Sequence, residues 1–271
     1  MTEDRKKQII EQISSAAKID EGAERGRKFR NIVGALCLEF VRTGDRWFLD
    51  EAIKTAGLVT DDPSKAYLEI AKTMAKVSIN KNDAGMLDEA LKITEKITDE
   101  IELSVALHDV VQAQAVIGIK QNNETLFSRS IDLINRIPRD TYRSSTYRNI
   151  ARMIMKSNPG KARRFLDKSI EIIEGKKIEP LFLASAFLDI SHLLATLNDM
   201  RYGDFLRKAI ELVDKMEDES DISAILLKTI ETEIALAKLL KDDILRQEAS
   251  GHSERISREY YKTLSIKCIT Q

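Results

Sequence analysis

Apolar residues recur along this chain of 271 residues at an interval of 38 to 40 residues. One series places a branched aliphatic residue at six equivalent positions: Ile32, Ile70, Val110, Ile150, Ile190 and Ile230. A second series joins a small residue to a branched apolar one: Ala52-Ile53, Ala90-Leu91, Ser130-Ile131, Ser169-Ile170 and Ala209-Ile210. Two interleaved series over nearly the whole chain indicate a repeat architecture, which limits the possible folds more than any single motif does.

Each period contains two helical patterns. The first stripe of the second period has spacings of three and four: Tyr67, Ile70, Ala71, Met74 and Val77. After a polar break at 80–83, a second stripe follows: Leu87, Ala90, Leu91, Thr94 and Ile97. The pattern predicts two antiparallel amphipathic helices per period, each about 15 to 18 residues long. Asn and Asp at the breaks predict turns and helix N-caps.

The composition agrees with an all-α protein, because four prolines and 6% aromatic residues are typical of long helices rather than sheets. One helix pair cannot bury its own apolar faces, so neighbouring pairs must stack. We therefore expect a single domain over 1–271, built from about six antiparallel pairs and roughly 13 helices. In this prediction 1–26 form an N-terminal capping helix, 27–250 the repeats and 251–271 a C-terminal capping helix. A partner-binding or dimer-forming role is the alternative for that last helix.

Residues 66–97 carry a resemblance to a known family. Tyr67, the large–small pair Ile70-Ala71 and the small residue Ala90 resemble the pattern of a tetratricopeptide-type repeat, and the similarity extends over about 10–250. The period of 38 to 40 residues is longer than the 34 residues typical of that family. The resemblance implies a right-handed α-α superhelix that serves as a non-enzymatic scaffold and binds a protein or peptide in its concave groove.

Comparing equivalent positions between periods predicts one polar face of the first helices. The position before each anchor is polar: Asn31, Glu69, Asp109, Asn149, Asp189 and Thr229. Two places after the anchor, no residue is large and apolar: Gly34, Lys72, Gln112, Arg152, His192 and Thr232. Both columns lie on one helix face, which by the resemblance lines the groove. The candidate partner-binding residues are Asp109, Gln112, Arg148, Asn149, Arg152, Lys156, Asp189 and His192. An ordinary solvated face is the alternative.

A basic run is the sharpest compositional feature. Ten Lys and Arg lie between Arg136 and Lys168 against two Asp, although the whole chain has a net charge of −1. The run spans two antiparallel helices, so its charges point several ways, and it lacks interleaved aromatic residues that could stack on bases. Three interpretations remain open: a solvated or internally paired surface, a docking site for an acidic peptide or carboxylate terminus, and nucleic-acid binding through 136–168.

The sequence contains no phosphate-binding glycine loop, nucleophile elbow or HExxH motif. His108-Asp109 and Asp189-x-x-His192 each place a carboxylate near an imidazole, but neither has a second pair to complete it. We therefore expect no enzyme, cofactor or metal site, and a small-ligand-binding repeat domain is a further alternative. No stretch approaches the roughly 18 apolar residues of a membrane span, which predicts a soluble cytoplasmic protein without a membrane partner. A homo-oligomer through the C-terminal helix remains open.

Overall fold

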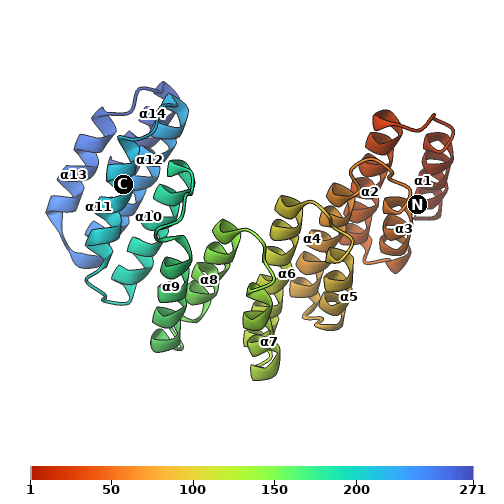
Figure 1. The fold of residues 1–271 in the computed structure, drawn as a ribbon, viewed down its shortest axis with the longest axis horizontal. Helices are drawn as coiled ribbons and strands as arrows, with labels where there is room; N and C mark the ends of the chain where they lie inside the picture. The colour runs from red at the N-terminus through yellow and green to blue at the C-terminus, as the bar shows by residue number, and fades with distance from the viewer. Residues whose placement is uncertain (1, 271) are drawn as a thin grey trace. The chain divides into compact units, whose positions relative to one another are not determined.

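The computed structural model describes residues 2–270, which form fourteen α-helices and no strand (Figure 1). The all-α prediction is confirmed. The chain divides into two compact units, 1–146 and 147–271. The division falls inside α8, and the expectation of a single domain stays a prediction. None of the described helices is both long and apolar enough to cross a membrane.

Unit 1 begins with one helix and continues as helix pairs. Its helices are α1 (Thr2–Ala16), α2 (Ala23–Thr43), α3 (Arg46–Ala56), α4 (Ser64–Lys81), α5 (Gly85–Thr94), α6 (Glu100–Lys120), α7 (Glu124–Ile134) and the beginning of α8 (Asp140–Ile154). Within this unit α2 packs on α3, α4 on α5, and α6 on α7. The first helices of the pairs also pack on one another, α2 on α4 and α4 on α6.

Unit 2 repeats this arrangement. It contains the end of α8, α9 (Pro159–Ile173), α10 (Pro180–Thr196), α11 (Tyr202–Val213), α12 (Glu219–Leu240), α13 (Asp243–Glu254) and α14 (Glu259–Thr270). Here α10 packs on α11 and α12, and α12 packs on α13. The last helix, α14, packs on both α12 and α13.

The two repeated series of the sequence form the core. Every first-helix anchor is buried, and all five small residues of the second series have no exposed surface. Small side chains at these positions let the two helices of a pair approach closely, and the larger anchors fill the space between pairs. The periodicity in the sequence is therefore the periodicity of the core.

The turns inside the pairs also repeat. A residue with left-handed backbone ends the first helix in five periods: Gly44, Asn82, Asn122, Asn198 and Lys241. An Asp or Asn follows each one, and its side chain accepts hydrogen bonds from backbone N–H groups at the start of the second helix. These contacts satisfy donors that the helix itself leaves free, and they confirm the predicted caps.

The predicted helix length is wrong for most second helices. The second helices α3, α5, α7, α11 and α13 have 10 to 12 residues, fewer than the expected 15 to 18. The apolar stripe extends past the C-terminal end of the helix, since Ile97 and Ile137 are buried just beyond α5 and α7. Their N–H groups donate to the carbonyls three residues earlier, those of Thr94 and Ile134. A tighter last turn thus keeps the apolar spacing after the α-helix has ended.

The small anchor of α5 provides a test of the packing. Replacing Ala90 by Leu is expected to lower the free energy of unfolding by about 1 to 3 kcal/mol, because the added atoms have no space at a fully buried position. Urea unfolding followed by circular dichroism measures the change. Lys92→Leu on the same helix, where the side chain is exposed, is the matched control and should change stability little. Equal stability of wild type and Ala90→Leu would contradict the close packing at this position.

Candidate functional site

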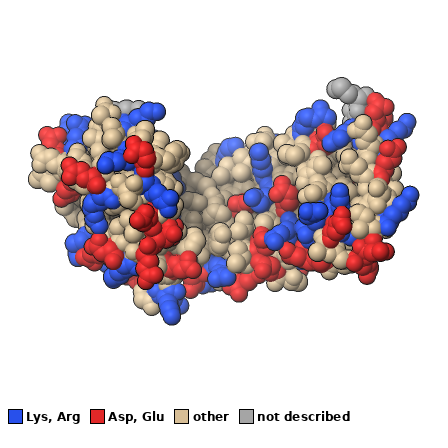
Figure 2. All heavy atoms as spheres, turned by 90° about the horizontal axis from the view of Figure 1, so that it is seen from above, with Lys and Arg blue, Asp and Glu red and all other residues tan. Residues whose placement is uncertain are grey.

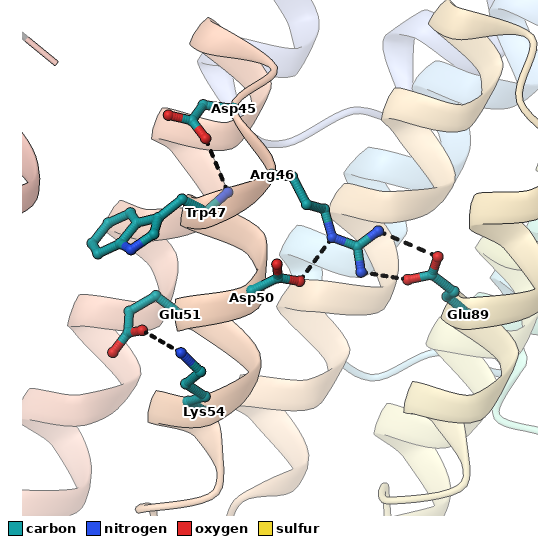
Figure 3. A network of polar contacts seen from close by, with 7 residues as sticks. All are labelled: Asp45, Arg46, Trp47, Asp50, Glu51, Lys54 and Glu89. Atoms are coloured by element: carbon teal, nitrogen blue, oxygen red, sulfur yellow. Dashed lines mark hydrogen bonds and ion pairs between the residues drawn. The ribbon is translucent and has the colours of Figure 1, made fainter.

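Ion pairs link the second helices of neighbouring periods within each unit. Arg46 of α3 lies 2.8 Å from Asp50 through Nε and binds both carboxylate oxygens of Glu89 on α5, at 2.6 and 3.2 Å (Figure 3). Equivalent pairs join Arg129 to Asp88, Arg201 to Asp167 and Lys208 to Glu174. These charges satisfy one another within the chain, and each exposed pair contributes little stability.

Carboxylates of the chain also pair with part of the basic run. Five of its ten cations lie within 4.0 Å of a carboxylate: Arg136 with Glu95, Arg139 with Glu100, Arg143 with Asp140, Arg148 with Asp189, and Arg163 with Asp199. Another, Lys168, lies over the ring of Tyr147 at 5.6 Å. On the face drawn in Figure 2, cationic and anionic side chains lie interspersed. At least half of the run therefore has its charge matched from within the chain.

The predicted partner-binding residues fall into both units. Asp109 and Gln112 belong to unit 1, whereas Arg148, Asn149, Arg152, Lys156, Asp189 and His192 belong to unit 2.

In unit 1, Asp109 and Gln112 line a pocket of about 440 Å³ on the first-helix side. The pocket is bounded by side chains of α2, α4 and α6: Cys37, Leu38, Val41, Glu69, Lys72, Thr73, Ala75, Lys76, Ile79, Asp109 and Gln112. Its polar end contains Glu69 and Asp109, and burial raises the pKa of Asp109 while the nearby Lys72 opposes this shift. Its other end contains Leu38, Val41 and Ile79.

Cys37 and His108 are both held in unreactive states beside this pocket. Burial raises the pKa of the Cys37 thiol to about 12, so the nucleophilic thiolate is not formed near neutral pH. Thr146 Oγ1 donates to the Tyr142 carbonyl and lies 2.7 Å from His108 Nδ1, so Nδ1 carries a proton and donates to it. Gln112 Nε2 approaches the other ring nitrogen of His108 and donates to it. Both ring nitrogens are thus engaged, and His108 is not placed to abstract a proton.

In unit 2, Asp189 lies close to Arg148, and His192 lies close to both Asp189 and Arg152. Arg148 Nε lies 3.8 Å from one carboxylate oxygen of Asp189, and Lys228 Nζ lies 3.0 Å from the other. Arg152 donates to the side-chain carbonyl of Asn149 at 3.0 Å. Burial lowers the pKa of His192, and the positive charge of Arg152 lowers it further, so this imidazole is neutral at pH 7. Neither Arg152 nor Lys156 has a carboxylate within 4.0 Å among the described residues.

Arg148 does not lie on an open face as the sequence suggested. It is only 7% exposed, and it also donates to the hydroxyl of Ser169 at 3.4 Å. Burial lowers the pKa of its guanidinium to about 10, opposed by Asp189. Its position two residues before an anchor turns it toward α9 as well as the first-helix face. Arg148 thus supports the packing of the pair, and Arg152 is the accessible cation.

The polar face predicted for the first helices is buried in the last period, on α12. Thr229 has no exposed surface and Thr232 has 8%, so the expectation that this face stays outside the core is wrong for α12. The reason is that α12 packs on α10, α11, α13 and α14, which leaves it few free sides. Each threonine hydroxyl donates to the carbonyl four residues earlier, which satisfies it within the helix.

Sequence reasoning missed two parts of these sites. Lys228 occupies the same column as Arg148, two residues before an anchor, and comparison of that column would have found it. Its ammonium group also binds the hydroxyl and carbonyl oxygens of Ser185, at 2.7 and 3.2 Å. Leu38 and Val41 were missed because an exposed apolar residue cannot be distinguished from a core residue by its spacing alone. Among the described residues, no group of three His, Cys, Asp or Glu side chains is placed to hold a metal ion.

Comparisons with known proteins add little to this description. No protein-family model matches the chain, and no curated protein matches it. Among solved structures, it is similar to the crystal structure of Ton1535 from Thermococcus onnurineus NA1, with 14% identity over 95% of this chain and 94% of that one. The TM-score of 0.26 is too low for this similarity to support an argument about fold or function. The sites described above therefore carry the functional interpretation.

Proposed function

We propose that this protein is a non-enzymatic helical-repeat module that binds a protein or peptide along the faces of its first helices. One observation carries the proposal: several charges on the second helices are paired between neighbouring periods, whereas three cations on first helices have no carboxylate partner. Lys72 and Lys76 of α4 and Arg152 of α8 have no carboxylate within 4.0 Å among the described residues. Unpaired charges beside exposed apolar groups are typical of a surface that a partner completes.

The chemistry of the first-helix faces favours binding over catalysis. Burial keeps the Cys37 thiol protonated, and hydrogen bonds engage the His108 imidazole. Among the described contacts, His192 is not hydrogen-bonded to Asp189. The paired state of half the basic run also argues for protein over nucleic acid, because phosphate binding needs cations that are free to exchange their counterions. A superhelical groove of the tetratricopeptide type is part of this proposal.

Photo-crosslinking inside cells tests the proposed binding face. A photoreactive amino acid placed at Lys76 or Lys156 is expected to capture partner proteins, because Lys76 is exposed on the first helix α4 and Lys156 is exposed just after the end of the first helix α8. The same group at Lys92 or Glu171, exposed on second helices, is the matched control and should capture far less. Cross-linked products are identified by mass spectrometry after nuclease treatment. Equal capture from both sides, or capture that nuclease removes, would contradict the proposal.

A further inference from the structure

An exposed apolar strip crosses the first helices of unit 1. Leu38 and Val41 of α2 are 70% and 40% exposed, and both line the pocket together with Ile79 of α4. Ile119 occupies the position of α6 equivalent to Ile79 and is 37% exposed. The ammonium group of Lys120 reaches the carbonyl of Ile79 at 3.5 Å, which places the ends of α4 and α6 side by side. We call Leu38, Val41, Ile79 and Ile119 the apolar strip.

Four lysines surround this strip: Lys72, Lys76, Lys81 and Lys120. None of the four has a carboxylate within 4.0 Å among the described residues. Lys72 and Lys76 stand one helical turn apart on α4, a spacing at which like charges repel and weaken a helix. Lys81 lies over the ring of Phe40 at 5.6 Å, and Lys120 contacts only a carbonyl oxygen. Four cations without a carboxylate within 4.0 Å thus lie near one apolar surface, with Lys72 at the end nearer Asp109.

Carboxylates of the same unit do not neutralise this surface. Glu39, on α2 next to Leu38, already binds Arg42 at 2.7 Å and Arg5 at 3.1 Å, and Arg42 lowers its pKa. Glu69 lies ten residues before Ile79 on α4, which is about 15 Å along the helix axis. Asp109 is half-buried at that same distant end of the pocket. The surroundings of the strip are therefore positively charged.

We propose that the occupant of this surface is an acidic amphipathic helix of a partner protein, lying across α2, α4 and α6. This inference rests on the proposed function and names the chemistry of its partner. Neighbouring packed helices lie about 8 to 10 Å apart, so equivalent positions of the strip repeat at that interval. A helix returns a side chain to the same face after seven residues, or about 10.5 Å. Apolar side chains of the partner at this spacing contact the strip, and its flanking Glu and Asp reach the four lysines.

The apolar strip distinguishes this partner from a nucleic acid. Lysines alone would suit a phosphate backbone, but bases bind to proteins by stacking on aromatic rings, and the strip consists of aliphatic side chains. An acidic helix uses both the aliphatic surface and the cations. Apolar burial then supplies most of the affinity, and the charges select the partner and its orientation.

Selection from a displayed library of random peptides, each roughly 18 residues or five helical turns long, tests the inference on the full chain. Enriched peptides are expected to carry net negative charge and apolar residues at intervals of three, four and seven. Their affinity, measured by fluorescence anisotropy, should fall about tenfold or more in Lys76→Glu/Lys120→Glu and in Leu38→Asp. The control Lys28→Glu/Lys92→Glu changes two exposed lysines of the same unit and should bind as wild type does. Circular dichroism confirms that each variant is folded.

The other outcomes separate this inference from the proposed function. Enriched peptides overturn the acidic helix but leave peptide binding intact if they are neutral or basic, or if they bind Lys76→Glu/Lys120→Glu and Leu38→Asp as tightly as wild type. If a labelled single-stranded oligonucleotide binds more tightly than any enriched peptide, and if that binding is lost in Lys76→Glu/Lys120→Glu and kept in Leu38→Asp, the acidic helix is overturned in favour of a phosphate backbone. If no peptide is enriched, the inference fails, and the photo-crosslinking result then decides separately whether the first-helix faces bind any protein.

Discussion

Replacing His252 by leucine is expected to lower the free energy of unfolding by about 3 kcal/mol. His252 of α13 holds Glu233 of α12, whose carboxylate has no exposed surface, through a contact of 3.0 Å between Nδ1 and Oε2. The other carboxylate oxygen, Oε1, is buried without a hydrogen bond among the described residues. Removing the imidazole would leave the whole carboxylate buried and unpaired, which costs far more than the pair itself contributes. Urea unfolding at pH 7 measures the loss.

The double variant Glu233→Leu/His252→Leu is the matched control. Equivalent positions in the preceding period are Leu193 and Leu212, so two leucines fit the packing of these columns. The double variant should therefore recover the stability of wild type or exceed it, because it removes the buried charge together with its partner. A double variant less stable than His252→Leu would show that the carboxylate is not the source of the cost.

The pair also makes stability depend on pH in a definite direction. Burial raises the pKa of Glu233, and the nearby Glu248 adds to this, while His252 opposes it. Above the ordinary glutamate pKa of about 4.3, the folded protein still binds this proton while the unfolded chain has lost it. The stability of wild type relative to Glu233→Gln should therefore fall as the pH rises above that value, and it should level off above the raised pKa. A rising difference would contradict the assignment.

Replacing Gln114 by methionine is expected to raise the free energy of unfolding by about 2 kcal/mol. Gln114 of α6 has no exposed surface, and both polar atoms of its amide are buried without a hydrogen-bond partner among the described residues. Other periods have an aliphatic residue or methionine at this position: Leu36, Met74, Ile154, Leu194 and Ile234. Methionine has nearly the same length as glutamine and adapts to irregular space, so it removes the desolvated amide without leaving a cavity.

The reciprocal change in the preceding period serves as the control. Met74→Gln on α4 places an amide in a fully buried position of the same column and should destabilise by a similar amount. Both variants are compared with wild type by urea unfolding, with the dependence on urea concentration fitted separately for each. If Gln114→Met were less stable than wild type, the amide of Gln114 would have a partner that its surroundings do not reveal.

The core could be predicted from the sequence because its side chains obey a period that the backbone imposes. The anchors Ile70, Val110 and Ile190 are all fully buried, as are Ala90 and Ser130 of the second series. The caps could be predicted for a similar reason, since Asp45 and Asn123 bond to N–H groups two and three residues away. Local chemistry determines such contacts, and a short stretch of sequence contains all of it.

The candidate site could be predicted only in part. The polar columns placed Asp109 and Gln112 in a real pocket and brought Arg152, Asp189 and His192 to one face of unit 2. Arg148, which flanks these columns, was also expected on an open surface, although it is buried. Column position determines the angle of a side chain around its helix axis, but it does not determine how far the neighbouring helix extends over that side chain.

By itself the sequence determined the all-helical class, the period of the core and the turns inside each pair, because these depend on residues close together in the chain. The tertiary structure alone decided which charges are matched and which stay free. Arg46 meets Glu89 and Arg148 meets Asp189 across about one period, while Lys76 and Lys120 meet no carboxylate among the described residues. An ion pair needs two charged groups within 4 Å. That distance is set by the packing of helices far apart in sequence, so only the fold could reveal the unpaired cations around the apolar strip.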